Sequence, residues 1–152
     1  MGIYLNPGNI DFQQALNSKI YVDKSMLIEY ANSVIYTEQK FICVSRPRRF
    51  GKSMAANMLT AYYSRGCDSK EMFSRLKIAE AESFEKHLNR YNVIHINMVN
   101  FLSESQNIDE MIGFVEEDLI DELKNEYPDV RYPRRENLIK VTKNLRQSIL
   151  IF

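Results

Sequence analysis

The stretch SRPRRFGKS, residues 45–53, decides how this chain is expected to fold. It follows an apolar run at residues 41–44 and precedes a segment, starting at Lys52, in which apolar residues recur at three- and four-residue spacing. A buried strand, a basic loop containing glycine, and an amphipathic helix, in that order, are the parts of a phosphate-binding loop. The sequence therefore predicts that an anion binds where this helix begins.

Each residue type in the loop has a role in that chemistry. Backbone N–H groups that point inward, together with a lysine and the helix N-terminus, neutralise phosphate oxygens. We expect Lys52 to pair with the β- and γ-phosphates of a nucleotide and the Ser53 hydroxyl to bind Mg²⁺. The expected nucleotide-binding residues are Arg48, Arg49, Phe50, Gly51, Lys52 and Ser53.

The loop departs from the usual pattern at its first position. The pattern G-x-x-x-x-G-K-[ST] places glycine at position 46, where this chain has Arg46. A positive φ would cost arginine about 1–2 kcal/mol, whereas glycine adopts it freely. Pro47 offers another way to set the turn, because its ring fixes its own φ and restricts the residue before it. Gly51, where the backbone comes closest to phosphate, is retained.

A second interpretation of the same stretch is a basic patch. Arg46, Arg48 and Arg49 lie within four positions and would suit a nucleic-acid backbone or an acidic partner, without any nucleotide role. Aromatic residues do not alternate with these arginines, and the densest other basic pair is Arg134–Arg135. A triphosphate carries enough negative charge to explain the arginines, so we favour the nucleotide site and keep the binding module as the alternative.

Length and composition agree with one ordinary globular domain. The chain has 152 residues, and its 20 basic residues balance its 20 acidic ones, so net charge does not indicate a nucleic-acid partner. We expect a cytoplasmic protein without a membrane partner, because the chain shows neither a secretory signal nor an apolar run of membrane-spanning length. Cys43 and Cys67 are too isolated to suggest zinc or a disulfide framework.

Hydrophobic patterns predict alternating strands and helices. The predicted strands occupy residues 40–45, 93–99 and 148–152, with a short β-prone piece at 20–23. The main predicted helices run from Lys52 to a stop at Gly66, over 108–123 with a capping box at 107–110, and over 136–146; shorter helices are expected near 11–17, 26–30, 69–76 and 82–88. This order indicates an α/β protein with a mainly parallel sheet.

Several reactive residue types are assigned structural roles. His95 alternates with isoleucines on a predicted strand and is interpreted as a packed or rim residue, while His87 is expected to be exposed. The acidic residues of the long helix are interpreted as its solvated face: Glu116, Glu117, Asp118, Asp121 and Glu122. We identify no catalytic nucleophile or general base.

Four segments together resemble the bacterial AAA-ATPase-like domain family. They are YVDKS at residues 21–25, FICVSRPRRFGKS at 41–53, KEMFSRLKI at 70–78 and YNVIHINM at 91–98. In this family arginine also replaces the first glycine of the loop. The resemblance implies a P-loop NTPase-like three-layer sandwich, ATP and Mg²⁺ as ligands, and in many members a following nuclease-like domain of the PD-(D/E)XK type. It also implies that residues 21–24 lie near the nucleotide base.

The resemblance also leads us to expect that residues 1–152 are an incomplete N-terminal part of the domain. The family's next element is a strand that ends in Asp-Glu, the Walker B acids, and residues 148–152 resemble its beginning. Without those carboxylates we expect nucleotide binding with little hydrolysis. Without a later strand between this one and the P-loop strand, we expect an exposed sheet edge and self-association.

Overall fold

The computed structural model describes residues 2–130, 132, 138–144 and 149–152. The helices are α1 (Ile10–Leu16), α2 (Met26–Val34), α3 (Lys52–Tyr63), α4 (Lys70–Phe73), η1 (Lys77–Glu80), α5 (Phe84–His87), α6 (Met98–Glu104), α7 (Ile108–Glu126) and α8 (Leu138–Asn144). The strands β1 (Asn92–Ile94) and β2 (Ile149–Ile151) pair in parallel, with Val93 opposite Leu150. The mixed α/β class is confirmed.

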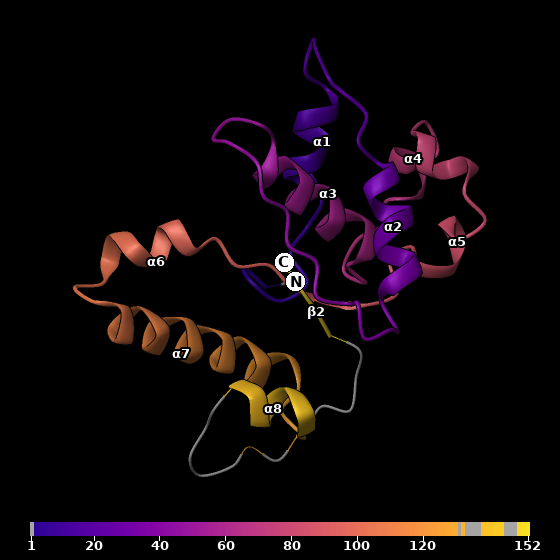
Figure 1. Ribbon diagram of the computed structural model, residues 1–152. Coiled ribbons are helices and arrows are strands. Elements are labelled where there is room, and N and C mark those ends of the chain that lie inside the picture. The colour runs from indigo at the N-terminus through magenta and orange to yellow at the C-terminus, as the bar shows by residue number, and fades with distance from the viewer. Residues whose placement is uncertain (1, 131, 133–137, 145–148) are drawn as a thin grey trace.

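The two strands lie between two groups of helices. In Figure 1, β2 is at the centre, with α1 to α5 on one side and α6, α7 and α8 on the other. Consecutive side chains of a strand point to opposite faces, so Val93 packs in one apolar cluster and Ile94 in the other. Both clusters thus use the sheet as a shared wall.

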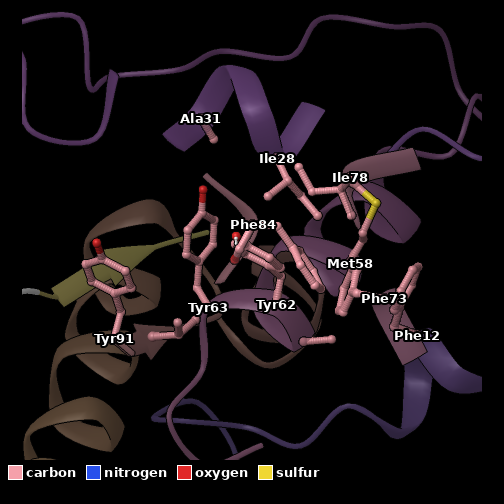
Figure 2. Close-up of a cluster of buried hydrophobic side chains, with 12 residues drawn as sticks. Phe12, Ile28, Ala31, Met58, Tyr62, Tyr63, Phe73, Ile78, Phe84 and Tyr91 are labelled. Carbon is pink, nitrogen blue, oxygen red and sulfur yellow. Dashed lines mark hydrogen bonds between the residues drawn. The ribbon is translucent and has the colours of Figure 1, made fainter. Parts of the chain in front are cut away.

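An aromatic cluster forms the larger core. Tyr62 and Tyr63 from α3 are fully buried and lie edge to face, with ring centroids 4.8 Å apart, and Tyr62 also contacts Phe73 (Figure 2). Their hydroxyls are satisfied inside the core, since Tyr63 donates to Asn32 Oδ1 at 2.6 Å and Tyr62 donates to the Phe84 carbonyl at 2.6 Å. These contacts fix the C-terminal half of α3 and leave its N-terminus at the surface.

The long helix α7 forms as its capping box predicts. The Asn107 side chain accepts a hydrogen bond from the Glu110 amide at 2.9 Å, and Glu110 accepts one from the Gln106 amide at 2.6 Å. Met111, Val115, Leu119 and Leu123 are buried as expected, whereas Ile108 and Ile112 remain exposed. Tyr127 ends the helix.

The predicted strand at residues 40–45 is wrong. This segment has no regular secondary structure and pairs with no strand among the described residues, and Phe41 is 86% exposed. A strand needs a hydrogen-bonded neighbour, and an apolar groove of about 480 Å³, lined by Phe41, Ile42 and residues 149–152, separates this segment from β2. The β-prone piece at 20–23 also forms no strand, because no neighbouring described segment pairs with it.

Other predictions fail at element boundaries. The strand expected over 93–99 ends at Ile94, and Met98 already begins α6, whose N-cap Asn97 accepts a hydrogen bond from the Val99 amide. α3 ends at Tyr63, before the expected stop at Gly66, because Ser64 is extended. The expected helices at 69–76 and 82–88 shrink to the single turns α4 and α5. Of the predicted element at 136–146, residues 136, 137, 145 and 146 lie outside the described residues, as does residue 148 of the last predicted strand.

Two side-chain interpretations need correction. His87 is 3% exposed, because its ring stacks on that of Tyr91 at the edge of the core. The prediction that His87 is exposed is therefore wrong. Glu122 belongs to no solvated face, since its carboxylate accepts hydrogen bonds from the amides of Ile3, Tyr4 and Leu5 at 2.7–3.0 Å. It fixes the N-terminal segment against α7.

Candidate functional site

The candidate site is the loop that leads into α3. Residues 48–51 form a turn, and α3 begins at Lys52, as the phosphate-loop pattern predicts. Gly51 has φ +80°, a left-handed conformation that glycine adopts without steric cost. Arg49 also has a positive φ, +67°, which costs an arginine on the order of 1 kcal/mol. Such strained residues concentrate at ligand-binding loops.

The amides of this loop are available for a ligand. Within the described part of the chain, no backbone N–H from Arg48 to Met54 donates a hydrogen bond, and the first amide to do so is Ala55, to the Gly51 carbonyl at 2.9 Å. Gly51 provides no side-chain cap. The positive end of the α3 dipole therefore meets a series of unused donors, which is the physical requirement for an anion cradle.

Lys52 extends back over the loop. Its Nζ donates to the carbonyl oxygens of Arg46 at 2.6 Å and Pro47 at 3.1 Å. The ammonium group thus lies across the concave side of the turn. Because the side chain is exposed, exchanging these two carbonyl oxygens for phosphate oxygens requires only a change of partner for the same group.

A second lysine reaches the loop from the segment that precedes α2. Lys24 Nζ donates to the Phe50 carbonyl at 3.3 Å and lies 3.5 Å from the position that a Cβ at Gly51 would take. Spacing along the sequence could not place Lys24 here, and only the family resemblance pointed to residues 21–24. Tyr21 does not share the site: it packs edge to face on Phe12, and burial together with Asp23 raises its pKa to about 12.

Two hollows adjoin the loop. One, of about 390 Å³, is lined by Arg48, Arg49, Gly51, Lys52, Ser53 and Met54. The other, of about 500 Å³, is lined by Lys52 and Ser53 together with Ile96 and Phe152, which follow the carboxyl ends of β1 and β2. Ligands of open parallel α/β sheets bind outside the carboxyl ends of the strands. Phe50 lines neither hollow and is 61% exposed, and its contact in the loop is made by its carbonyl, which accepts a hydrogen bond from Lys24.

The residues around Ser53 fit a magnesium ion that takes few protein ligands and completes its shell with water and phosphate oxygens. Asp11 is the single acidic side chain that lines the larger hollow, and the described residues contain no group of three or more His, Cys, Asp or Glu side chains arranged to hold a metal. Mg²⁺ commonly takes one or two protein oxygens and completes its shell with water and substrate phosphates. The hydroxyl of Ser53 suits that arrangement, whereas the described residues offer no cluster of acidic or imidazole ligands for an all-protein cage.

His95 lines the larger hollow as a half-buried side chain. Burial lowers its pKa, and the nearby Asp11 opposes this effect only in part. The imidazole is therefore neutral at pH 7, and the positive charge at this end of the sheet comes from the loop. Its position at the rim agrees with the structural role expected for it.

One family model matches the chain over residues 8–150, and its description is "AAA-ATPase_like: Predicted AAA-ATPase". This range includes the loop, β1, all the described helices and the first two residues of β2. Comparison with curated proteins and with solved structures finds no match. No described helix is both long enough and apolar enough to cross a bilayer.

Proposed function

The chain belongs to the AAA-ATPase-like family of predicted AAA-ATPases, and we propose that its loop at residues 46–53 binds ATP together with Mg²⁺. One observation carries the proposal: a helix mouth with unused amides, Lys52 and Ser53 opens onto the same hollow as the carboxyl ends of two parallel strands. An anion there meets backbone donors, an ammonium group and a helix dipole at once.

Each charged residue has an expected role in binding. Lys52 pairs with the terminal phosphates, and the amides of residues 48–53 surround them. Arg48 and Arg49 line the smaller hollow, where their guanidinium groups neutralise the remaining phosphate charge. Ser53 holds Mg²⁺, which would supply charge neutralisation between the phosphates. Lys24 holds the Phe50 carbonyl away from the anion.

We expect this 152-residue chain to hydrolyse ATP very slowly. Attack by water on a phosphoryl group needs carboxylates that position the metal and the water. Asp11, the one acidic side chain that lines the hollow beside Ser53, is an exposed residue of α1. Binding without turnover is therefore the activity that these residues support.

The fold proposal follows from the same arrangement. Helices lie on both faces of a parallel pair of strands, and the basic loop precedes a helix at the carboxyl edge. We propose that residues 1–152 form the N-terminal part of a domain of the P-loop three-layer type, in which residues 41–45 become a strand once a neighbour fills the groove beside β2.

A titration with nucleotide distinguishes this proposal from the basic-patch alternative. We expect ATP to bind in a calorimeter with an affinity that falls at least about tenfold when Mg²⁺ is removed, because Mg²⁺ neutralises phosphate charge. GTP in a parallel titration defines base preference. If instead Arg48→Gln and Arg49→Gln abolish a steeply salt-dependent binding of DNA or RNA, and ATP does not bind, the loop is a nucleic-acid module.

We further propose that two copies of the chain associate through the open edge of β2. The backbone of Phe152 donates to Ile94 and accepts from Ile96, so the backbone groups of Ile151 point the other way, into the apolar groove. The chain itself carries a matching occupant, the unpaired apolar segment at 41–44. Reciprocal exchange of this segment in a two-fold pair would fill both grooves.

Sedimentation velocity tests this association. The weight-average mass is expected to rise with protein concentration, and Phe41→Lys to weaken the association at least about tenfold, because it places a charge in the partner's groove. Ile20→Lys is the matched control, since Phe41 and Ile20 are both 86% exposed. A monomer at every concentration, or equal effects of the two variants, contradicts the proposal.

A further inference from the structure

A second basic hollow lies at the opposite end of α3 from the loop. It has a volume of about 400 Å³, and its lining includes Arg65, Lys86, His87 and Arg90. Arg65 lies just after the C-terminus of α3, and the phosphate loop lies at its N-terminus. The helix is about 18 Å long at 1.5 Å per residue. None of the residues that line this hollow belongs to the phosphate loop. Because the length of α3 separates the two places, the hollow is too far from the loop to bind the phosphates of a nucleotide held there.

The floor of the hollow is a buried hydrogen-bonded relay. His87 and Tyr91 are 3% and 5% exposed, and His87 Nδ1 lies 2.6 Å from the Tyr91 hydroxyl. The Tyr91 hydroxyl lies 3.0 Å from that of Tyr36, whose ring is 72% exposed at the rim. Tyr91 is buried enough to hold the relay in place, because its ring also packs on Tyr63. The polar groups of His87 and Tyr91 are thus fixed at the bottom of the hollow, and the hydroxyl of Tyr36 is accessible at its edge.

The rim of the hollow carries positive charge in excess. Arg65 lies 3.9 Å from Glu126 and over the Tyr127 ring, whereas Lys86 and Arg90 form no ion pair among the described residues. This positive charge also affects His87 at the floor of the hollow. Burial is the largest cause that lowers the pKa of His87, and the charges of Lys86 and Arg90 lower it further. An anion entering the hollow would relieve this repulsion and gain two guanidinium groups as donors.

We propose that this hollow is a second anion site, which binds the phosphate group of a small molecule between Arg65, Lys86 and Arg90. Two guanidinium groups and one ammonium group match the several oxygens and the double charge of a phosphate better than those of a single carboxylate. The exposed ring of Tyr36 provides a flat wall for the remainder of the ligand. The site is independent of ATP binding, because none of its residues belongs to the loop.

The two histidines provide separate reporters for the two sites. His87 lines the second hollow and His95 lines the one beside Lys52 and Ser53, so each C2 proton in an NMR spectrum reports one site. The histidine count is two, and His95→Gln assigns both signals. The groups that face His87 are Tyr36 after α2, Arg65 after α3, and Lys86, Arg90 and Tyr91 around α5.

Titration with inorganic phosphate tests the proposal. The His87 signal is expected to shift to saturation, the pKa of His87 to rise on binding, and both responses to persist in Lys52→Ala. Lys86→Gln with Arg90→Gln is expected to weaken the response at least about tenfold, while Lys19→Gln with Lys140→Gln, which removes the same charge elsewhere, leaves it unchanged. Phenyl phosphate in a parallel titration is expected to bind more tightly than inorganic phosphate, through Tyr36.

Three results would overturn the second site. In the first, phosphate moves only the His95 signal, which assigns all binding to the loop. In the second, sodium chloride at equal ionic strength produces the same shift of His87, which reduces the effect to screening. In the third, the Lys86 and Arg90 substitutions leave the response unchanged. Both exchanged residues are exposed, so loss of the fold is not expected to obscure the outcome.

Discussion

Replacing Lys52 by alanine is expected to weaken ATP binding at least about 100-fold, with the thermal stability of the free chain nearly unchanged. The ammonium group provides charge-assisted hydrogen bonds to phosphate, each worth about 1.5–3 kcal/mol, and about 1.4 kcal/mol corresponds to a factor of ten. In the free chain the same group bonds to the exposed carbonyls of Arg46 and Pro47, which water can satisfy after its removal. Calorimetric titration and thermal unfolding measure the two effects separately.

A matched control makes this result specific. Lys19→Ala removes the same charge from an exposed residue that lines none of the hollows near the loop, so ATP affinity is expected to stay within about a factor of two. Lys52→Arg is expected to recover little, because the planar guanidinium cannot replace a compact ammonium group in the same turn. Equal affinity of Lys52→Ala and the unaltered chain would refute the nucleotide site while leaving the second anion site untouched.

Local signals in the sequence predicted the parts of the fold that local interactions determine. The capping box at 107–110 places α7, and the Gly51–Lys52 step places the start of α3, because both depend on residues within one turn. The proposed site residues were likewise chosen from their order along the chain. Spacing could not identify Lys24, since its contact with the Phe50 carbonyl joins residues 26 positions apart.

Signals that depend on distant partners failed. Residues 41–44 have the composition of a buried strand, yet composition does not supply the neighbouring strand to which they would bond. His87 follows the same rule in part, because its burial depends on Tyr36, far earlier in the chain, as well as on stacking against the nearby Tyr91. A histidine in a polar stretch gives no local indication of either contact.

The hydrogen bonds that hold the C-terminus of α3 were also invisible in the sequence. The Asn89 amide group donates to the carbonyls of Ala61 and Ser64 at 3.1 and 2.9 Å, and its Oδ1 accepts from the Ser69 amide at 3.0 Å. Its backbone has φ +53°, a conformation that asparagine tolerates better than most residues. One side chain therefore satisfies carbonyls that the end of a helix leaves without partners.

Asn89→Ala is consequently expected to lower the free energy of unfolding by about 2–4 kcal/mol, from roughly 1 kcal/mol for each lost hydrogen bond and about 1 kcal/mol of strain at positive φ. Urea denaturation measures the change. Asn89→Gly loses the hydrogen bonds but not the backbone conformation, so it should be less destabilising than alanine. Asn89→Asp turns a carboxylate oxygen towards the helix carbonyls and should be at least as destabilising as alanine.

Asn17→Ala is the matched control for this series, since Asn17 is exposed and meets the end of α1 through its backbone amide, which the substitution retains. Its effect should stay within about 0.5 kcal/mol. If Asn89→Gly were as stable as the unaltered chain, the side-chain hydrogen bonds would contribute nothing and backbone strain alone would explain the alanine variant. If glycine and alanine were equally destabilising, the hydrogen bonds would carry the whole effect, and α3 would depend on Asn89 for the termination of the helix that begins at the phosphate loop.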